Sequence, residues 1–330
     1  MTRLLVFEPS FAGIEAALAR WAGALEPVLV GRDGEIRHGR NSLTREDAAP
    51  EVAWFSGELY QQPAMSPFIA ATLASPDLKW FQSSAAGFDH PIFARIAAKG
   101  ARLTTSHGQA VGMADFVLSG VLDHFQRGPE RRAAQARGEW RGYPFREVNA
   151  STWLIIGFGA VGQGVATRAR GFGARIIGVR RHQGADPAAD FIVPPEAVLE
   201  HLPGADVVVL CAPLSAATYH IANAAFFAAM KAGSVLANVG RGNLIDEAAL
   251  LAALGRGAPA HAVLDVFETE PLPPDSPFWA HPAVSLSPHA SGITGAQDGR
   301  NRDLFLDNLA RYLDGRPLLN EVDPKDLEAG

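Results

Sequence analysis

Short apolar runs alternate with longer segments of helical periodicity along most of the chain. The runs are rich in Val, Ile, Leu and Phe, which is typical of buried strands. The expected strands cover residues 4–7, 28–30, 52–55, 78–81, 152–156, 175–179, 207–210, 234–238, 262–264 and 284–286. Apolar residues at helical spacing predict helices over residues 11–21, 92–98, 111–125, 161–170, 224–230, 247–254 and 296–312. This alternation predicts an α/β protein with parallel sheets.

Bulk composition limits the classes of function. A length of 330 residues suggests two domains, and 48% hydrophobic residues supply packed cores. A formal net charge of -6 argues against binding to nucleic acid or to an anionic membrane. Apolar runs fall short of the roughly 20 residues of a membrane span, and an acid at Glu8 comes too early for a signal peptide. We therefore expect a cytoplasmic protein.

Two further features favour a structural interpretation over a functional one. Cys211 is the only cysteine, so no internal disulfide forms, which fits a reducing compartment. It ends the apolar run of residues 207–210 and is expected to be a buried residue rather than a nucleophile. Residues 126–146 are rich in arginine, but Glu130 and Glu139 are interspersed, so a solvated face is favoured over an anion-binding surface.

A glycine motif follows the strand expected at residues 152–156 and precedes a helix. It reads Gly-Phe-Gly-Ala-Val-Gly and comprises Gly157, Gly159, Ala160, Val161 and Gly162 with Phe158. Strand, glycine turn, helix and second strand form the context of a dinucleotide site. The first glycine permits a tight turn, the second a close approach to pyrophosphate, and the third close packing of helix on strand. We therefore predict dinucleotide binding at the helix N-terminus, against the alternative of a purely structural turn.

The end of the next strand discriminates between cofactors. Sites for NAD place an acid about 20 residues after the first glycines, where it binds the ribose hydroxyls. This chain has Arg180 and Arg181 there, and no acid before Asp186. Two guanidinium groups suit the 2′-phosphate of NADP, so NADPH is favoured and NAD stays possible. The alternative is an ordinary pair of surface arginines.

Three more stretches follow expected strands, at the strand ends where open α/β sheets bind ligands. They span residues 238–247 with Arg241, residues 264–273 with Asp265 and Glu270, and residues 287–294 with His289. Each of these residues by itself is usually a surface or turn residue. Their joint occurrence at strand ends indicates a functional site.

Together these stretches resemble the D-isomer-specific 2-hydroxyacid dehydrogenase family. Two others fit the same pattern, at residues 212–218 and at residues 84–90, the second including Asp89. With the glycine motif, six separated motifs occur in the family's order over most of the chain. The resemblance implies a reductase of the glyoxylate/hydroxypyruvate kind, which converts a small 2-oxo acid to the D-2-hydroxy acid with NAD(P)H and needs no metal.

The resemblance also implies a role for each residue. Arg241 would bind the substrate carboxylate and polarise the C2 carbonyl, a task that suits a permanently charged planar fork. His289 would be the acid/base, with Glu270 as the carboxylate that favours its imidazolium form. The backbone N–H groups of Ala86 and Gly87 would also hold the carboxylate. Cofactor contacts are implied for Ala212, Pro213, Thr218 and Asp265.

The family fold implies two Rossmann-like parallel-sheet domains, with the cofactor domain inserted in a discontinuous substrate domain. We expect the substrate-binding domain at residues 1–101 and 293–330 and the dinucleotide-binding domain at residues 102–292. The resemblance implies a homodimer, with residues 111–125 as a candidate interface helix whose alternative role is core packing. A chain ending at residue 330 is expected to lack the regulatory domain of some phosphoglycerate dehydrogenases.

Two rival functions stay open. Formate-type dehydrogenases pair their histidine with glutamine, so Glu270 argues against that activity. Corepressors of the same fold sense nucleotides and can keep the Arg–Glu–His set, so the sequence does not separate them from an enzyme. The sequence also does not name the 2-oxo acid, because selectivity depends on pocket shape, to which residues 54–60 are expected to contribute.

Overall fold

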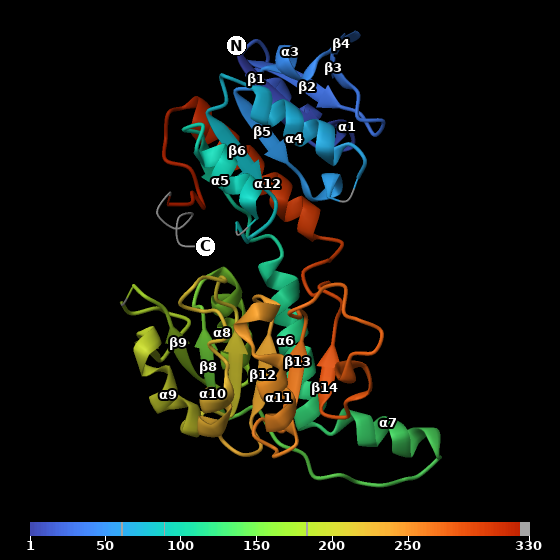
Figure 1. Ribbon diagram of the computed structural model, residues 1–330, viewed down its shortest axis with the longest axis vertical. Coiled ribbons are helices and arrows are strands. Elements are labelled where there is room, and N and C mark those ends of the chain that lie inside the picture. Colours follow the sequence, from blue (N-terminus) through green and yellow to red (C-terminus); the bar gives the residue numbers. More distant parts are fainter. Residues whose placement is uncertain (61, 89, 183, 324–330) are drawn as a thin grey trace. The chain divides into compact units, whose positions relative to one another are not determined.

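The computed structural model describes residues 1–60, 62–88, 90–182 and 184–323. The chain divides into two compact units (Figure 1). Unit 1 comprises Met1–Gln109 and Thr294–Gly330, and unit 2 comprises Ala110–Ile293. Each unit has a seven-stranded sheet covered by helices. The predicted α/β fold, with one parallel-sheet unit inserted into another, is confirmed.

Unit 1 is built on the strand order β4-β3-β2-β1-β5-β6-β7. Its strands are β1 (Thr2–Phe7), β2 (Leu25–Val30), β3 (Ile36–His38), β4 (Asn41–Leu43), β5 (Val52–Phe55), β6 (Trp80–Ser83) and β7 (Arg102–Thr104). Its α-helices are α1 (Glu8–Ala12), α2 (Glu15–Leu18), α3 (Arg45–Ala48), α4 (Met65–Ala74), α5 (Pro91–Ala97) and α12 (Gln297–Leu313). Short 3₁₀ helices are η1 (Ala19–Trp21) and η2 (Gly57–Leu59).

Several features of unit 1 differ from the prediction, including helices α3 and α4 and strand β7, which the sequence analysis did not predict. Strands β2, β3 and β4 form an antiparallel meander at the sheet edge, which the sequence analysis did not predict. The helix expected over residues 11–21 is wrong, because the segment is broken into α1, α2 and η1. The break lies at Gly13, a poor helix former, and Ile14, whose side chain is buried in the core.

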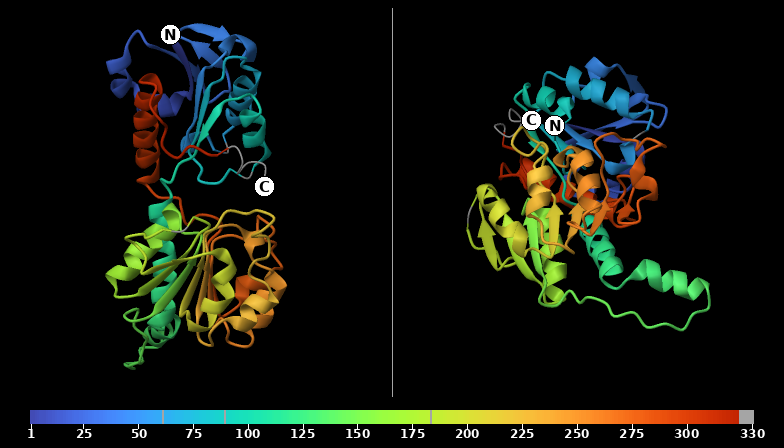
Figure 2. Two further views of the ribbon diagram at one scale, coloured as in Figure 1. Left: turned by 90° about the vertical axis from the view of Figure 1, so that its left-hand side faces the viewer. Right: turned by 60° about the horizontal axis from the view of Figure 1, so that its bottom comes forward.

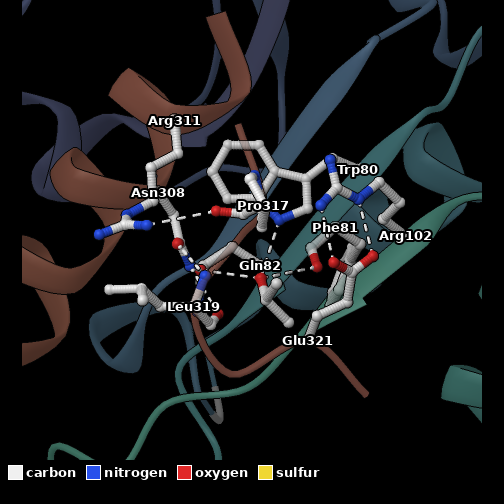
Figure 3. A network of polar contacts seen from close by, with 10 residues as sticks. Trp80, Phe81, Gln82, Arg102, Asn308, Arg311, Pro317, Leu319 and Glu321 are labelled. Atoms are coloured by element: carbon white, nitrogen blue, oxygen red, sulfur yellow. Dashed lines mark hydrogen bonds and ion pairs between the residues drawn. The ribbon is translucent and has the colours of Figure 1, made fainter. Parts of the chain in front are cut away.

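The C-terminal part of the chain is an integral part of unit 1. Phe305 of α12 stacks on Trp54 with ring centroids 4.3 Å apart. Beside it, the buried Gln82 accepts hydrogen bonds from Thr104 Oγ1 at 2.8 Å and Asn308 Nδ2 at 2.9 Å (Figure 3). Asn308 Oδ1 in turn accepts a hydrogen bond from the backbone N–H of Leu319 at 2.7 Å. This satisfied polar network fixes α12 and the segment after it against the sheet, which makes unit 1 discontinuous in sequence.

Unit 2 has an all-parallel sheet in the order β10-β9-β8-β11-β12-β13-β14. The strands are β8 (Thr152–Ile156), β9 (Arg175–Val179), β10 (Phe191–Val193), β11 (Val207–Leu210), β12 (Val235–Asn238), β13 (His261–Leu264) and β14 (Val284–Leu286). The α-helices are α6 (Ala110–Phe125), α7 (Gly128–Ala136), α8 (Ala160–Gly171), α9 (Val198–His201), α10 (Ala224–Ala229) and α11 (Glu247–Leu254). Short 3₁₀ helices are η3 (Pro195–Ala197), η4 (Leu202–Gly204), η5 (Gly242–Leu244) and η6 (Pro277–Ala280).

The order of the strands in unit 2 reverses direction at β8. From β8 the chain proceeds outward through β9 to β10 on one side, and through β11 to β14 on the other. Such a switch point leaves a crevice at the carboxyl ends of the central strands, where doubly wound sheets bind ligands. The glycine motif follows β8, and the other sequence motifs of this unit follow β9, β11, β12, β13 and β14.

A helical arm extends from the body of unit 2 (Figures 1 and 2). It consists of α7 and the loop of residues 137–147. Its charges pair along the exposed surface, as in Arg132–Asp123 at 2.6 Å and Arg137–Glu139 at 2.6 Å. This pairing agrees with the solvated face expected for residues 126–146.

Among the residues that the structure describes, no helix has both the length and the apolar character required to cross a membrane.

Candidate active site

The glycine turn after β8 packs too tightly for side chains at two of its three glycines. Gly157 adopts φ +95°, and an added Cβ would overlap the backbone of Ala212. At Gly162, an added Cβ would lie 2.5 Å from the carbonyl oxygen of Gly157. Both positions therefore require glycine, the first for the turn and the second for the contact of α8 with β8.

Gly159 differs, because an added Cβ there meets no atom of the described residues within 4 Å. Gly159 is the N-cap of α8, and it has no side-chain cap hydrogen bond in the described structure. Ala160 and Val161 are the first residues of this 12-residue helix, so their N–H groups belong to the unpaired first turn. An open helix N-terminus with a glycine that leaves room for a ligand fits the pyrophosphate of a dinucleotide.

The loop after β11 packs against the glycine turn through Cys211 and Ala212. Cys211 Sγ donates a hydrogen bond to Gly157 O at 3.1 Å, and burial raises the pKa of this thiol to about 12. A thiol with so high a pKa is no nucleophile near neutral pH, in agreement with the expected structural role. Further along, Thr218 Oγ1 donates to Pro213 O at 2.8 Å and accepts from the backbone N–H of Ser215 at 2.8 Å. Thr218 thus shapes the loop that begins at Ala212.

The loop after β9 is folded around Arg180. Its guanidinium donates hydrogen bonds to Asp186 Oδ2 at 3.0 Å and to the carbonyl oxygens of His182 and Gly184 at 2.8 and 3.1 Å. Asp186 also accepts a hydrogen bond from Gln163 of α8 at 3.1 Å. Arg181, the next residue, is exposed. Arg180 therefore organises the loop, a role that the sequence analysis did not predict.

Glu270 and His289 are brought together from the loops after β13 and β14. His289 Nδ1 lies 2.6 Å from Glu270 Oε2, and both side chains are partly exposed. The other carboxylate oxygen of Glu270 accepts a hydrogen bond from the backbone N–H of Phe267 at 3.0 Å. The carboxylate is therefore fixed on one side and holds the imidazole on the other. This arrangement leaves Nε2 as the ring nitrogen available for proton transfer.

The backbone of His289 is held in the left-handed region at φ +51°, and Asp265 fixes it there. The carbonyl oxygen of Asp265 accepts the N–H of His289 at 2.8 Å. Its buried carboxylate accepts the N–H groups of Ala290 and Ser291 at 2.8 and 3.0 Å, and the Ser291 hydroxyl at 2.5 Å. Asp265 thus determines the conformation of the histidine loop, and Ser291 is a further residue of the site that the sequence analysis missed.

Arg241 lies on the loop after β12, next to the loop that carries Glu270. Asn238 holds this loop, since its Nδ2 donates to Arg241 O at 2.9 Å and its Oδ1 accepts from the N–H of Gly240 at 3.0 Å. The partly buried guanidinium donates to Gly240 O at 2.9 Å. Strands β12 and β13 are parallel neighbours, so the two loops leave the same edge of the sheet.

Ala86 and Gly87 belong to unit 1, on the loop after β6. The start of this loop is fixed by a hydrogen bond from the N–H of Ala85 to Ser83 Oγ at 3.0 Å, and by one from the N–H of Ser106 to Ala85 O at 2.9 Å. Ala86 and Gly87 are partly buried. Asp89 of the same motif lies outside the described residues.

No group of three or more His, Cys, Asp or Glu side chains in the part of the chain that the structure describes is arranged to hold a metal ion.

The geometry defines a class first: a dinucleotide-binding α/β enzyme with a carboxylate–histidine pair at the carboxyl edge of its cofactor sheet. Residues 118–291 match the model of the D-isomer specific 2-hydroxyacid dehydrogenase, NAD binding domain. The chain belongs to the D-isomer-specific 2-hydroxyacid dehydrogenase family. It is accordingly an NAD(P)-dependent 2-hydroxyacid dehydrogenase, as the resemblance predicted.

Relatives with assigned activities support the family. The glyoxylate reductase of Korarchaeum cryptofilum is 32% identical over 255 residues, which is 73% of this chain and 75% of the relative. The glyoxylate/hydroxypyruvate reductase B of Citrobacter koseri is 34% identical over 260 residues, 76% of this chain and 79% of the relative. Among solved structures, the NADPH-dependent glyoxylate/hydroxypyruvate reductase of Sinorhizobium meliloti in complex with NADP and sulfate has a TM-score of 0.77 at 27% identity, over 98% of this chain and 99% of that one.

Proposed function

We propose that the protein reduces a small 2-oxo acid, of the glyoxylate or hydroxypyruvate kind, to the D-2-hydroxy acid with NADPH. The observation that carries the proposal is the contact of 2.6 Å between His289 Nδ1 and Glu270 Oε2. A histidine held in this way by a fixed carboxylate is suited to general acid–base chemistry. Two relatives reported above are named glyoxylate reductase and glyoxylate/hydroxypyruvate reductase, which supports the same substrates for this protein.

Each residue of the proposed site has one task. The bound nicotinamide supplies the hydride when the cofactor is present. Arg241 binds the substrate carboxylate through its planar guanidinium and polarises the C2 carbonyl. His289 donates the proton from Nε2 to the C2 oxygen, and Glu270 orients the ring through its contact with Nδ1. The N–H groups of Ala86 and Gly87, in unit 1, are proposed as further ligands of the carboxylate.

The proposed domain roles follow from these assignments. Unit 2 would bind the cofactor through Gly157, Gly159, Gly162 and the first turn of α8. Ala212, Pro213 and Thr218 would add further contacts, and Asp265 would lie at the nicotinamide end. Because the carboxylate of Asp265 already accepts three hydrogen bonds from Ala290 and Ser291, we propose that it serves the nicotinamide end mainly through the histidine loop. Unit 1 would contribute the substrate contacts of Ala86 and Gly87.

Preference for NADPH over NADH is proposed on the chemistry at the end of β9. Arg180 and Arg181 occupy the position at which an acid would bind the ribose of NAD. The relative from Sinorhizobium meliloti is NADPH-dependent and was solved with NADP. In this proposal Arg180 orders the loop and Arg181 contributes charge to the 2′-phosphate.

A substrate panel tests the function. Glyoxylate, hydroxypyruvate and pyruvate would be assayed with NADPH and NADH, and formate with NADP⁺ and NAD⁺, by following absorbance at the nicotinamide band. We expect turnover of at least one 2-oxo acid, no oxidation of formate, and a higher kcat/KM with NADPH. Tight binding of either cofactor with negligible turnover of every acid would instead favour the nucleotide-sensing alternative.

A homodimer is proposed as the assembly, through the helical arm rather than α6. The apolar face of α6 is buried in unit 2, where Ala114, Val117 and Val121 belong to the core, so core packing accounts for it. By contrast, Trp140 on the arm is fully exposed and Phe145 is 56% exposed. Large aromatic side chains exposed on a projecting segment are typical of interaction sites.

Light scattering tests the assembly. The unmodified chain is expected at about twice the mass of 35.0 kDa, and Trp140→Ala is expected to shift it toward the monomer. Trp279→Ala is the control. Trp279 is a half-exposed tryptophan as well as a member of η6, so it lies outside the arm. A monomeric unmodified chain, or equal dissociation by both variants, would contradict the proposal.

A further inference from the structure

We propose that Glu268, together with Glu247 and His220, is a brace that positions the Arg241 loop against the Glu270 loop for catalysis. These three residues are called the brace below. The inference rests on the proposed function, since it assigns positioning residues to that reaction. The need for such a device follows from the site, because Arg241 and Glu270 stand on separate loops and must act on the same small substrate.

The central part of the brace is a reciprocal pair of hydrogen bonds. The backbone N–H of Glu268 donates to Glu247 Oε1 at 2.8 Å. The backbone N–H of Glu247 donates to Glu268 Oε1 at 3.2 Å. Each glutamate side chain thereby binds the main chain of the other residue, 21 positions away, and joins the start of α11, which follows the Arg241 loop, to the Glu270 loop. Charge-assisted bonds to backbone N–H groups are stronger than neutral ones, so the pair fixes the spacing of the two loops.

The backbones of the Arg241 loop and the Glu270 loop are also in direct contact, at Gly242 and Phe267. An added Cβ at Gly242, the residue after Arg241, would overlap the carbonyl of Phe267 and lie 2.5 Å from the nitrogen of Glu268. Phe267 N–H in turn holds Glu270 Oε1. The main chain beside Arg241 is thus in contact with the main chain that fixes Glu270. This close approach is independent of the two glutamate side chains, and any shift of one loop would be transmitted to the other.

His220 extends the brace to a third loop, the one after β11. Its Nε2 lies 3.0 Å from Glu268 Oε1, a contact between charges when the imidazole is protonated. Its backbone adopts φ +49°, and its N–H donates to Asn243 O at 2.8 Å, two residues beyond Arg241. The ring is also stacked on Tyr219 with centroids 4.0 Å apart. A residue held in the left-handed region by such contacts is over-determined by its surroundings.

The electrostatics of the pair agree with a positioning role. Burial raises the pKa of Glu247, and the nearby Glu268 carboxylate raises it further against the effect of the backbone hydrogen bond. Two carboxylates so close repel each other, and the hydrogen bonds from the two backbone N–H groups hold them in place against that repulsion. None of the three is required to touch the substrate in this proposal, because they act through Arg241 and Glu270.

Glu268→Ala removes the central acceptor and is the main test. We expect KM for the 2-oxo acid to rise about tenfold and kcat to fall about tenfold, since small displacements of positioning groups have effects of this size or larger. The dissociation constant for NADPH should stay within twofold. Glu268→Gln keeps an acceptor oxygen for the N–H of Glu247 and is expected to retain most of the activity. The control is Glu200→Ala, which removes an exposed acid of α9.

A double variant separates positioning from general damage to the fold. In the Arg241→Lys background the planar grip on the carboxylate is already lost, so Glu268→Ala should cost much less than tenfold in KM. Multiplicative effects of the two changes would overturn the brace. So would a kcat/KM of Glu268→Ala within twofold of Glu200→Ala, or a loss matched by equal weakening of NADPH. Absence of turnover in the unmodified chain would reject the proposed function as well, whereas normal turnover that Glu268→Ala leaves unchanged rejects the brace alone.

Discussion

His289→Ala is expected to lower kcat about 10³-fold, equivalent to roughly 4 kcal/mol of transition-state stabilisation, while the dissociation constant for NADPH changes less than about twofold. The size follows from the typical contribution of a positioned general acid. The neighbouring side chains do not replace the imidazole, because Ala290 carries no proton donor and the Ser291 hydroxyl is bound to Asp265.

The geometry explains why the loss should fall on kcat. Glu270 contacts Nδ1 of His289, and the hydrogen bonds from the loop to Asp265 fix the backbone of His289 at φ +51°. Most of the organisation therefore survives removal of the ring, and the cofactor turn after β8 is a separate element. Steady-state kinetics at saturating NADPH, with the cofactor affinity from fluorescence titration, measure the two effects separately.

The matched control is His201→Ala, which removes a histidine at the end of α9. It should leave kcat within twofold. Retained turnover in His289→Ala would remove this histidine from the mechanism. A loss of kcat accompanied by an equal loss of NADPH affinity would mean that the variant disturbs the fold of unit 2 rather than proton transfer.

The sheet of unit 2 was largely predictable from the sequence, for a physical reason. Parallel strands that are buried on both faces read as continuous apolar runs, and β8, β9 and β11 have the predicted bounds. The short strands β3 and β4 in unit 1 lack this signal, because they lie at a sheet edge and include polar residues such as Arg37 and Asn41. Helices α4 and α7 were missed as well: the first is apolar without a clear polar face, and the second has no large apolar residue.

The candidate site divides in the same way. The glycine turn, Arg241, Glu270 and His289 lie in compact motifs, so a motif together with its flanking strand predicts them. The hydrogen bonds between Asp265 and Ser291 join residues 26 positions apart, and those between Glu247 and Glu268 join residues 21 positions apart. Such contacts depend on the register of neighbouring strands, which periodicity along the chain does not contain. Serine and glutamate in a loop are also too common to signal a role by themselves.

Changing Arg180 and Arg181 to glutamine together is expected to weaken NADPH about 100-fold and NADH no more than a few-fold. Loss of charge-assisted hydrogen bonds to a phosphate has this order of effect, and only NADPH carries the 2′-phosphate. The structure adds that the two arginines should not contribute equally. Arg180 holds its own loop through Asp186 and two carbonyl oxygens, so its removal releases the loop that both cofactors would contact.

The single variants separate these contributions. Arg181→Gln should weaken NADPH alone, whereas Arg180→Gln should weaken both cofactors, NADPH more strongly. A charge-matched control is Arg40→Gln with Arg45→Gln, which removes two exposed positive charges on either side of β4 in unit 1. If that control weakened NADPH as much, the effect would come from the overall field rather than from a clamp. Equal losses of NADPH and NADH in the Arg180/Arg181 double variant would exclude the clamp and leave Arg180 only its role in folding the loop.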